Sequence, residues 1–276
     1  MTLSKPTVRV AGVQMVSGTS LEANLRTAEA LIAEAAAGGA ELVALPEYFC
    51  LMGRTDADKV AAREADGRGP VQDFLADQAR RHGLWLVGGT TPLEATQPGR
   101  VRNSVLVYGP DGARVARYDK IHLFNFVKGE ENYDEARTIE PGREVKSFSF
   151  APKCGVPLKV GLSVCYDLRF PELYRAMGEP DLILVPAAFT ATTGRAHWAT
   201  LLKARAIENL CYVLAPAQGG RHENGRATFG HTMLIDPWGG VVAERDEGPG
   251  VVIGDIQPHL THELRGSLPA LSHRVL

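Results

Sequence analysis

The stretch Leu158–Pro171 constrains the fold more than any other part of the chain. It begins with Val160–Val164, an apolar run rich in β-branched residues that is typical of a buried strand. The run ends at Cys165, and Pro171 opens an expected helix over Glu172–Met177, because proline favours the first helical turn. A cysteine between a buried strand and a helix lies on a sharp turn, where its thiol can face a cleft beside backbone N–H groups. The alternative is a buried core cysteine, the usual environment of a free thiol.

The composition is that of an ordinary globular protein. The chain has 276 residues, of which 45% are hydrophobic and 22% charged, and its formal net charge is −2. A core of this size forms without disulfides or a structural metal. The near-neutral charge argues against a nucleic-acid partner, and no apolar run is long enough to span a bilayer. Met1–Arg9 also lacks the apolar core of a secretion signal, so we expect no membrane partner.

The cysteines and histidines do not have the spacing of a metal site. The four cysteines are far apart and form no Cys-x-x-Cys pair, so we expect reduced thiols in a cytoplasmic protein. The eight histidines contain no His-Glu-x-x-His pattern. We therefore predict no bound metal and leave three cysteines as structural or inert, namely Cys50, Cys154 and Cys211.

Apolar runs and helical periods alternate along the chain without a repeat or linker, so we expect a single domain over residues 1–276. Hairpins occur in some places and strand–helix units in others, which predicts a mixed sheet or two packed sheets with helices outside. Strands are expected at Val8–Met15, Leu42–Leu45, Leu84–Gly88, Leu182–Val185, Cys211–Ala217 and Gly250–Ile256, and hairpins at Val101–Val107 with Arg114–Tyr118 and at His231–Asp236 with Val241–Glu244. Helices are expected from Leu21 to Ala35, over Val71–Arg81 and over Ala196–Asn209; Phe124–Arg143, Ala187–Gly194 and Gln218–Ala227 are expected to be loops, and Gln257–Leu276 has no clear period.

Three chemically active residues share one position in this pattern. Glu47, Lys120 and Cys165 each follow an expected strand, and ligand sites in α/β folds gather beyond strand ends. Their types fit covalent acyl transfer, in which the thiol attacks a carbonyl or nitrile carbon. The carboxylate moves the proton, and the ammonium stabilises the developing oxyanion. A cysteine–histidine pair is the alternative, and His122, two residues past Lys120, is the histidine best placed for it.

Each of these residues also has an ordinary structural interpretation. Glu47 could be an exposed loop carboxylate, although Pro46 just before it favours a functional position. Lys120 in isolation is typical of a solvated turn. Asp167 and Arg169 could form a surface ion pair.

Three segments resemble the motifs of the nitrilase (carbon–nitrogen hydrolase) superfamily: Leu45–Glu47, Tyr118–Phe124 and Val164–Leu173. The likeness covers nearly the whole chain. It implies an α/β fold, the four-layer α-β-β-α sandwich of the nitrilase type, a homodimer or larger homo-oligomer, and no metal or organic cofactor. The superfamily has a second catalytic glutamate after its lysine motif, and Glu135 matches it.

Within the superfamily, the chain resembles the amidase branch that includes the omega-amidases and the deaminated glutathione amidases. The resemblance implies an amidase that forms an acyl-thioester and hydrolyses deaminated glutathione to 2-oxoglutarate and cysteinylglycine. The alternatives are an omega-amidase on 2-oxoglutaramate-type amides, a nitrilase, or a catalytically silent binding protein. At Tyr48-Phe49-Cys50 the branch more often has Cys-Phe-Asn. The segments shared with the branch are Phe189-Thr190, Thr193-Gly194, Ala196–Trp198 and Arg205–Asn209. Ala215–His222 and Leu268–Arg274 look more like the deaminated glutathione amidases.

The expected substrate is a small amide that carries at least one carboxylate. Arginine binds carboxylates best through its planar fork, and Arg169 and Arg221 are the candidates. For Arg169 the alternative is an ion pair with Asp167 or Glu172. The Tyr166 backbone N–H is expected near the substrate carbonyl oxygen, and the remaining substrate-binding candidates are Phe189 and Thr190.

Overall fold

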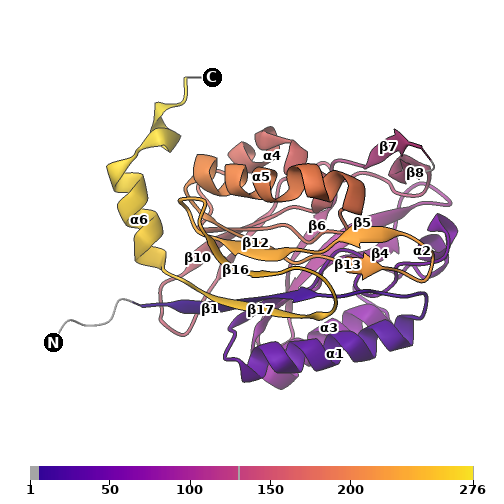
Figure 1. Cartoon of the computed structure of the whole chain (residues 1–276). Coiled ribbons are helices and arrows are strands. Elements are labelled where there is room, and N and C mark those ends of the chain that lie inside the picture. The colour runs from indigo at the N-terminus through magenta and orange to yellow at the C-terminus, as the bar shows by residue number, and fades with distance from the viewer. Residues whose placement is uncertain (1–5, 130, 276) are drawn as a thin grey trace.

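The computed structural model describes residues 6–129 and 131–275, in which two β-sheets stack face to face (Figure 1). The strands of the first sheet are β1 (Val8–Gln14), β2 (Leu42–Ala44), β3 (Trp85–Val87), β4 (Thr91–Glu94), β5 (Val101–Tyr108), β6 (Arg114–Asp119) and β17 (Gly250–Ile256). They run in the order β17-β1-β2-β3-β5-β4, with β6 paired to β5. β1, β2 and β3 are mutually parallel, and the remaining pairings are antiparallel.

The second sheet contains the strand that leads to the predicted nucleophile. Its strands are β9 (Ser147–Phe150), β10 (Leu158–Leu162), β11 (Leu182–Leu184), β12 (Tyr212–Ala215), β15 (Thr232–Ile235) and β16 (Val241–Arg245). Their order is β16-β15-β12-β11-β10-β9, and the three central strands β10, β11 and β12 are parallel. Two small two-stranded sheets lie beside these, β7 (Asn125–Lys128) with β8 (Glu131–Asp134) and β13 (Gly219–Arg221) with β14 (Ala227–Phe229).

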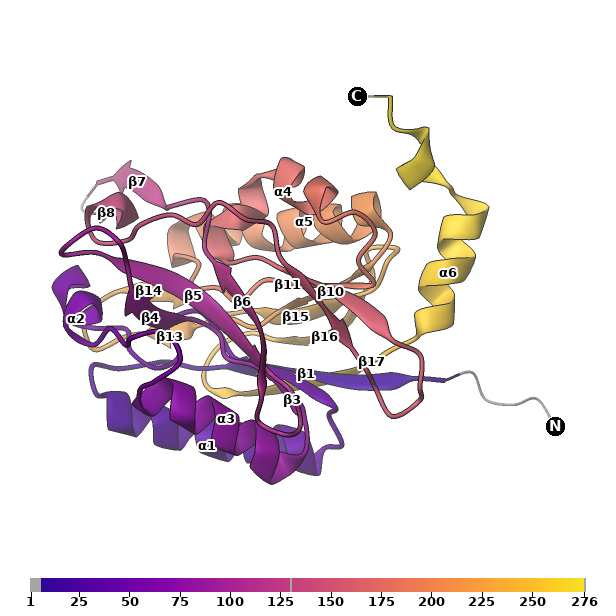
Figure 2. The ribbon, with the colours of Figure 1, turned by 180° about the vertical axis from the view of Figure 1, so that it is seen from behind.

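Helices cover the outer face of each sheet, as both ribbon views show (Figures 1 and 2). α1 (Leu21–Ala37) and α3 (Pro70–His82) lie on the first sheet, and α4 (Pro171–Ala176) and α5 (Ala191–Asn209) lie on the second. The four-layer α-β-β-α sandwich that the motif resemblance implied is therefore confirmed, and of the two arrangements left open by the residue pattern the chain forms two packed sheets. The other helices are α2 (Asp56–Ala61) and α6 (Pro258–Ser267). None of the helices in the described ranges is both long and apolar enough to cross a membrane.

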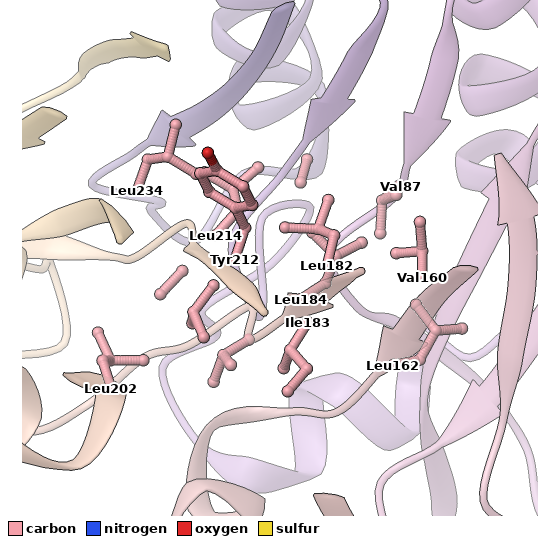
Figure 3. Close-up of a cluster of buried hydrophobic side chains, with 14 of the residues drawn as sticks. Val87, Val160, Leu162, Leu182, Ile183, Leu184, Leu202, Tyr212, Leu214 and Leu234 are labelled. Atoms are coloured by element: carbon pink, nitrogen blue, oxygen red, sulfur yellow. The ribbon is translucent and has the colours of Figure 1, made fainter. Parts of the chain in front are cut away.

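The two-residue period of the strands divides their side chains between two cores. On β1, Val8 and Val10 face the second sheet, whereas Ala11 and Val13 pack with residues of α1 and α3. The core between the sheets is a continuous cluster of buried aliphatic side chains that includes Val160, Leu184 and Leu214 (Figure 3). Burying one such side chain stabilises the fold by about 1.5–3 kcal/mol, so this cluster holds the strand ends in a fixed relation.

Several segments without a strong sequence pattern differ from expectation. Phe124–Arg143 was expected to be an irregular loop but contains the β7–β8 hairpin and a short 3-10 helix at Glu135–Arg137, because the strands of that hairpin bury too little to show an apolar alternation. The expected loop Gln218–Ala227 likewise contributes to the β13–β14 hairpin. α5 begins at Ala191 rather than Ala196, since the Thr190 hydroxyl caps the helix by accepting from the Thr193 N–H.

The C-terminal stretch contains a helix that its sequence did not predict. α6 buries only Thr261 among its described residues, and an element that buries almost nothing has no apolar period to detect. Pro258 occupies its first turn.

Candidate active site

The strand ends that precede Glu47, Lys120 and Cys165 meet at one place, as the sequence predicted. Lys120 directly follows β6, and its Nζ donates to Glu47 Oε1 at 2.9 Å. Glu135 completes the cluster from the segment after β8, since Lys120 Nζ also donates to its two carboxylate oxygens at 3.0 and 2.8 Å. Glu135 and Cys165 both line one small cavity. Two sheets and a loop therefore deliver a thiol, an ammonium and two carboxylates to one site.

Cys165 lies at a sharp turn between strand and helix. Its φ of 48° is in the left-handed region, where a side chain costs about 1–3 kcal/mol unless the surroundings hold it. The surroundings do so here, because the Cys165 N–H donates to the carbonyl of Pro186 at 2.9 Å. A 3-10 turn over Cys165–Arg169 then leads into α4.

Asp167 connects this turn to the lysine-bearing segment. The carboxylate is fully buried and accepts from the Val164 N–H at 2.8 Å, within its own turn. It also accepts from the Tyr118 hydroxyl at 2.7 Å and the His122 N–H at 3.0 Å, which flank Lys120. The bonds across the sheets fix the turn that carries Cys165 relative to the Lys120 ammonium.

The Glu47 carboxylate is enclosed and fully engaged. Its side chain is 1% exposed, and Oε1 accepts from Asn103 Nδ2 at 2.9 Å in addition to Lys120. Oε2 accepts from the Ala188 N–H at 2.9 Å. A carboxylate bound by an ammonium, an amide and a backbone N–H has one orientation, which suits repeated proton transfer at a fixed place.

Glu135 and Lys120 hold each other in their charged forms. Burial lowers the pKa of Lys120, but the carboxylates of Glu135 and Glu47 outweigh burial and keep that pKa above its ordinary value. Burial likewise raises the pKa of Glu135, and the Lys120 ammonium outweighs it, so the net pKa is lowered. Glu135 also accepts from the Tyr48 hydroxyl at 2.8 Å and from the Phe124 N–H at 2.7 Å.

Cys165 is a neutral thiol in this environment. Burial raises its pKa most, and the nearby Glu47 carboxylate raises it further. The Lys120 ammonium acts in the opposite direction but does not compensate, so the pKa lies well above its ordinary value of 9.0. A neutral thiol needs a base at the moment of attack, and Glu47 is an adjacent carboxylate.

The cavity brings together most of the predicted substrate-binding residues. Tyr166, Phe189 and Thr190 line it together with Cys165 and Glu135. Sequence reasoning did not identify the other lining residues, which are Phe124, Ala188, Thr193 and Arg226.

The two predicted carboxylate-binding arginines lie elsewhere. Arg221 is exposed on β13 and does not line the cavity. Arg169 lies beside the cavity, with its guanidinium carbon 5.7 Å from the Tyr166 ring centre and 5.4 Å from that of Phe189. Its Nη2 is 3.3 Å from His197 Nδ1. The alternative ion pair with Asp167 is wrong, since that carboxylate is committed to the contacts described above.

The cysteine–histidine alternative finds no support in this geometry. His122 Nδ1 is 2.7 Å from Asp167 Oδ1, and the imidazole stacks on Phe170 with ring centres 3.7 Å apart. His122 is not among the residues that line the cavity. Its contacts with Asp167 and Phe170 indicate that His122 supports the turn at Cys165–Arg169.

One group in the described ranges has the donor types and proximity to hold a metal, and it lies outside this cavity. His231, Glu244 and Asp246 offer ligand atoms within 4.8 Å of one another, near β15 and β16. His231 Nδ1 is 2.6 Å from Glu244 Oε1, so these two residues already contact each other through a surface hydrogen bond or ion pair.

Comparison with known proteins supports the resemblance seen in the motifs. The family model described as carbon-nitrogen hydrolase matches residues 9–266. The chain is 42% identical over 269 residues to a protein of Synechocystis sp. named deaminated glutathione amidase, covering 96% of this chain and 97% of that one. It is 40% identical over 273 residues to the human protein of the same name, covering 96% of this chain and 81% of that one. The crystal structure of Saccharomyces cerevisiae Nit3, a member of branch 10 of the nitrilase superfamily, superposes with a TM-score of 0.85 at 29% identity, covering 99% and 98% of the two chains.

Proposed function

Because this chain belongs to the carbon–nitrogen hydrolase family, we propose that it is an amidase with Cys165 as its nucleophile. Members of the family are hydrolases that act on non-peptide carbon–nitrogen bonds. The observation that carries the proposal is the enclosed cluster of Glu47, Lys120 and Glu135 beside a neutral thiol. It supplies a base, a fixed cation and a second carboxylate at one end of the sandwich.

In the first half-reaction, Cys165 attacks the amide carbon while Glu47 takes the thiol proton. The new S–C bond converts the carbonyl oxygen into an oxyanion, which the Lys120 ammonium and the Tyr166 backbone N–H stabilise. That N–H lies at the start of the 3-10 turn, where the first N–H groups of a helix have no acceptor inside it. As the oxyanion collapses, the C–N bond breaks and Glu47 returns the proton to the leaving nitrogen. The acyl group stays on the sulfur as a thioester.

In the second half-reaction, water attacks the thioester carbon and Glu47 takes a proton from that water. Collapse breaks the C–S bond, the proton passes to the sulfur, and a carboxylic acid leaves. Glu135 keeps the ammonium in place through both halves, because its two oxygens accept from Lys120 Nζ. No step changes the charge of Lys120, which agrees with the direction of its pKa shift.

We propose deaminated glutathione as the substrate, giving 2-oxoglutarate and cysteinylglycine. The names of the cyanobacterial and human relatives support this choice, as does the length over which they match. An omega-amidase would use the same machinery and release ammonia from 2-oxoglutaramate. The two functions differ only in the leaving group, so product identification separates them.

The test is a panel of deaminated glutathione, 2-oxoglutaramate and a nitrile, with each product identified. We expect the highest kcat/KM for deaminated glutathione, with cysteinylglycine released. Cys165→Ala should remove turnover and keep cooperative unfolding, while the wild type should form an acyl adduct on Cys165 that mass spectrometry detects. An acyl adduct on a different cysteine, or activity of Cys165→Ala within a few-fold of wild type, contradicts the proposal. Preferred turnover of 2-oxoglutaramate moves the substrate to the omega-amidase class.

We also propose that the protein is a cytoplasmic homodimer or larger homo-oligomer. All four cysteines are free, which suits a reducing compartment. The resemblance to the nitrilase superfamily supports self-association.

A further inference from the structure

We propose that Arg226 binds the carboxylate in the acyl half of the substrate and so gives the enzyme its preference for amides with an anionic acyl group. The inference rests on the proposed amidase function and deepens it, since it names the group that recognises the substrate's charge. Arg226 lies five residues beyond Arg221, in the turn that leads into β14.

The position of Arg226 suits contact with a substrate that is bound at Cys165. It lines the same cavity as Cys165 and Glu135. Its Nη2 donates to the Ala188 carbonyl at 2.9 Å, and the N–H of Ala188 donates to Glu47 Oε2 at 2.9 Å. Arg226 and Glu47, the base of the proposed reaction, therefore both bind the backbone of Ala188, one at its carbonyl and the other at its N–H.

The guanidinium has unused capacity to bind an anion. Its Nε is buried without a hydrogen-bond partner, and none of the carboxylates in residues 6–129 and 131–275 forms an ion pair with it. The buried Arg205 serves for comparison, because all three of its guanidinium nitrogens have acceptors. Its Nε and Nη2 donate to Leu168 O, and its Nη1 donates to Glu208. A buried guanidinium nitrogen without an acceptor is costly, and a carboxylate that binds the guanidinium compensates for that cost.

The charge balance of the site gives a second reason. Lys120 is shared by Glu47 and Glu135, so this cluster has one cation against two carboxylates. An anionic substrate would be repelled by that excess in a site of low dielectric. Arg226 is the cation among the described residues that line the cavity, and its charge offsets the excess.

Tyr133 also restricts the orientation of the Arg226 guanidinium. The Arg226 guanidinium carbon lies 5.0 Å from the centre of the Tyr133 ring on β8. The contact with the Tyr133 ring and the hydrogen bond to Ala188 restrict the guanidinium, which lowers the entropy lost when it binds a planar carboxylate.

A purely structural role is the competing explanation. In that role Arg226 would only hold the Ala188 carbonyl and, through it, Glu47. Loss of Arg226 would then slow every substrate by the same factor, whatever the substrate's charge. Substrate charge therefore separates the two explanations.

The experiment compares kcat/KM for 2-oxoglutaramate, whose carboxylate is in the acyl half, with kcat/KM for neutral pentanamide. In Arg226→Gln the ratio of the two should fall by about 10–100-fold, the scale of a lost charge-assisted hydrogen bond. Arg226→Lys should recover part of it. Arg221→Gln is the matched control, since it removes a nearby arginine that is exposed, and its ratio should equal that of wild type. An equal loss for both substrates in Arg226→Gln and Arg226→Lys would overturn the inference.

A third substrate identifies which carboxylate is bound. Pentanoyl-cysteinylglycine carries its charge only in the leaving half. In Arg226→Gln the turnover of this substrate should fall no further than that of pentanamide, because the inference places the bound carboxylate in the acyl half. A selective loss of pentanoyl-cysteinylglycine turnover would place it in the leaving half and overturn the inference.

A binding measurement separates this inference from the proposed reaction. Calorimetric titration of Cys165→Ala with 2-oxoglutarate should show binding that weakens by at least about 10-fold when Arg226→Gln is added. Unchanged affinity would overturn the inference even if amides are hydrolysed. If wild type turned over no amide and formed no adduct, the proposed function would fail, and the titration would still decide the role of Arg226.

Discussion

At the scale of single residues, the thiol of Cys165, which we propose as the nucleophile, is not ionised in advance. Many reactive cysteines have a lowered pKa, which a helix N-terminus or a cation provides. Here burial and the Glu47 carboxylate raise the pKa of the thiol more than the Lys120 ammonium lowers it. In the proposed mechanism the thiolate therefore forms only when Glu47 takes the proton, so that reactivity depends on a correctly placed amide. In the proposed reaction, the carboxylate that raises the pKa of the resting thiol is also the base that removes its proton.

Because Glu47 both raises the pKa of the thiol and serves as the proposed base, replacing it should raise the thiolate fraction and lower kcat. Glu47→Gln removes a negative charge, so the thiol pKa should fall and the thiolate fraction at a given pH should rise. Removing the base should nevertheless lower kcat by about 10²-fold or more. The measurement is the pH dependence of Cys165 alkylation by iodoacetamide, followed by peptide mass spectrometry, beside kcat. The partly exposed Cys154 reports reagent reactivity in the same samples.

Wild type should show alkylation of Cys165 that rises with pH up to about 9, since the raised pKa places its titration above that value. In Glu47→Gln the profile should move to lower pH. A plateau below pH 9 in wild type, or full kcat in the variant, would be incompatible with this account.

At the scale of elements, Lys120 is held by backbone contacts on both sides. Its N–H donates to the Asn103 carbonyl of β5 at 3.0 Å, and its carbonyl accepts from the Gly142 N–H at 2.8 Å. A Cβ on Gly142 would overlap the Asp119 carbonyl oxygen. The strand that precedes the lysine and the segment after Glu135 therefore pass too close for a side chain between them. This contact fixes the backbone position of Lys120 and therefore the position from which its ammonium reaches Glu47.

Gly142→Ala should therefore shift the peptide at Asp119–Lys120. Overpacking of this kind costs about 1–3 kcal/mol of stability, and a misplacement of about 1 Å can lower a catalytic rate about 10²-fold. We expect kcat to fall at least about 10-fold while the protein still unfolds cooperatively; thermal unfolding and kcat check both. Gly266→Ala in α6 is the control, because nothing lies within 4 Å of its added Cβ. An unchanged kcat in Gly142→Ala would show that this contact does not position the lysine.

At the scale of the whole molecule, the site and the uncovered apolar surface lie on different parts of the sandwich. Trp238 is 62% exposed in the turn between β15 and β16, and Ile207 is 50% exposed on α5. The two belong to one surface, because a Cβ on Gly239 would lie 2.7 Å from Ile207 Cδ1. Exposed aromatic and aliphatic side chains that adjoin one another are typical of a protein–protein contact. α6 extends beside the body of the molecule in both views (Figures 1 and 2).

We predict that this surface is used in self-association. Sedimentation velocity at assay concentration should give at least twice the 29.8 kDa mass of the chain. Ile207→Asp should shift the distribution toward the monomer, because the charge would be desolvated in a contact. Val156→Asp, which changes a comparably exposed residue outside this surface, should not. A wild-type monomer with full activity would contradict the prediction.

Much of the architecture and the chemistry was accessible from the sequence, because both rest on local patterns. Apolar runs such as Val8–Met15 give strands wherever both faces are buried, and the resulting β1 has the expected position. Glu47, Lys120 and Cys165 each stand just beyond such a run, so their convergence follows once the strands share an edge. The turn at Cys165 was predicted for the same reason, and its positive φ agrees with it. Local order along the chain thus indicated strands with helices outside them and the three groups that we propose for the reaction, whereas the four-layer sandwich was implied by the motif resemblance.

What only the tertiary structure decided are the contacts between segments without a pattern. Arg221 and Arg226 belong to one stretch that was expected to be a glycine-rich loop, and no period indicates which of the two faces inward. The choice depends on the register of the β13–β14 hairpin and on the packing of Tyr133 and Ala188 against Arg226. The pKa of Cys165 is likewise set by burial and by charges from other elements. Sequence periodicity reports which residues are buried within one element, whereas substrate selection and proton affinity depend on distances between elements that only the folded chain defines.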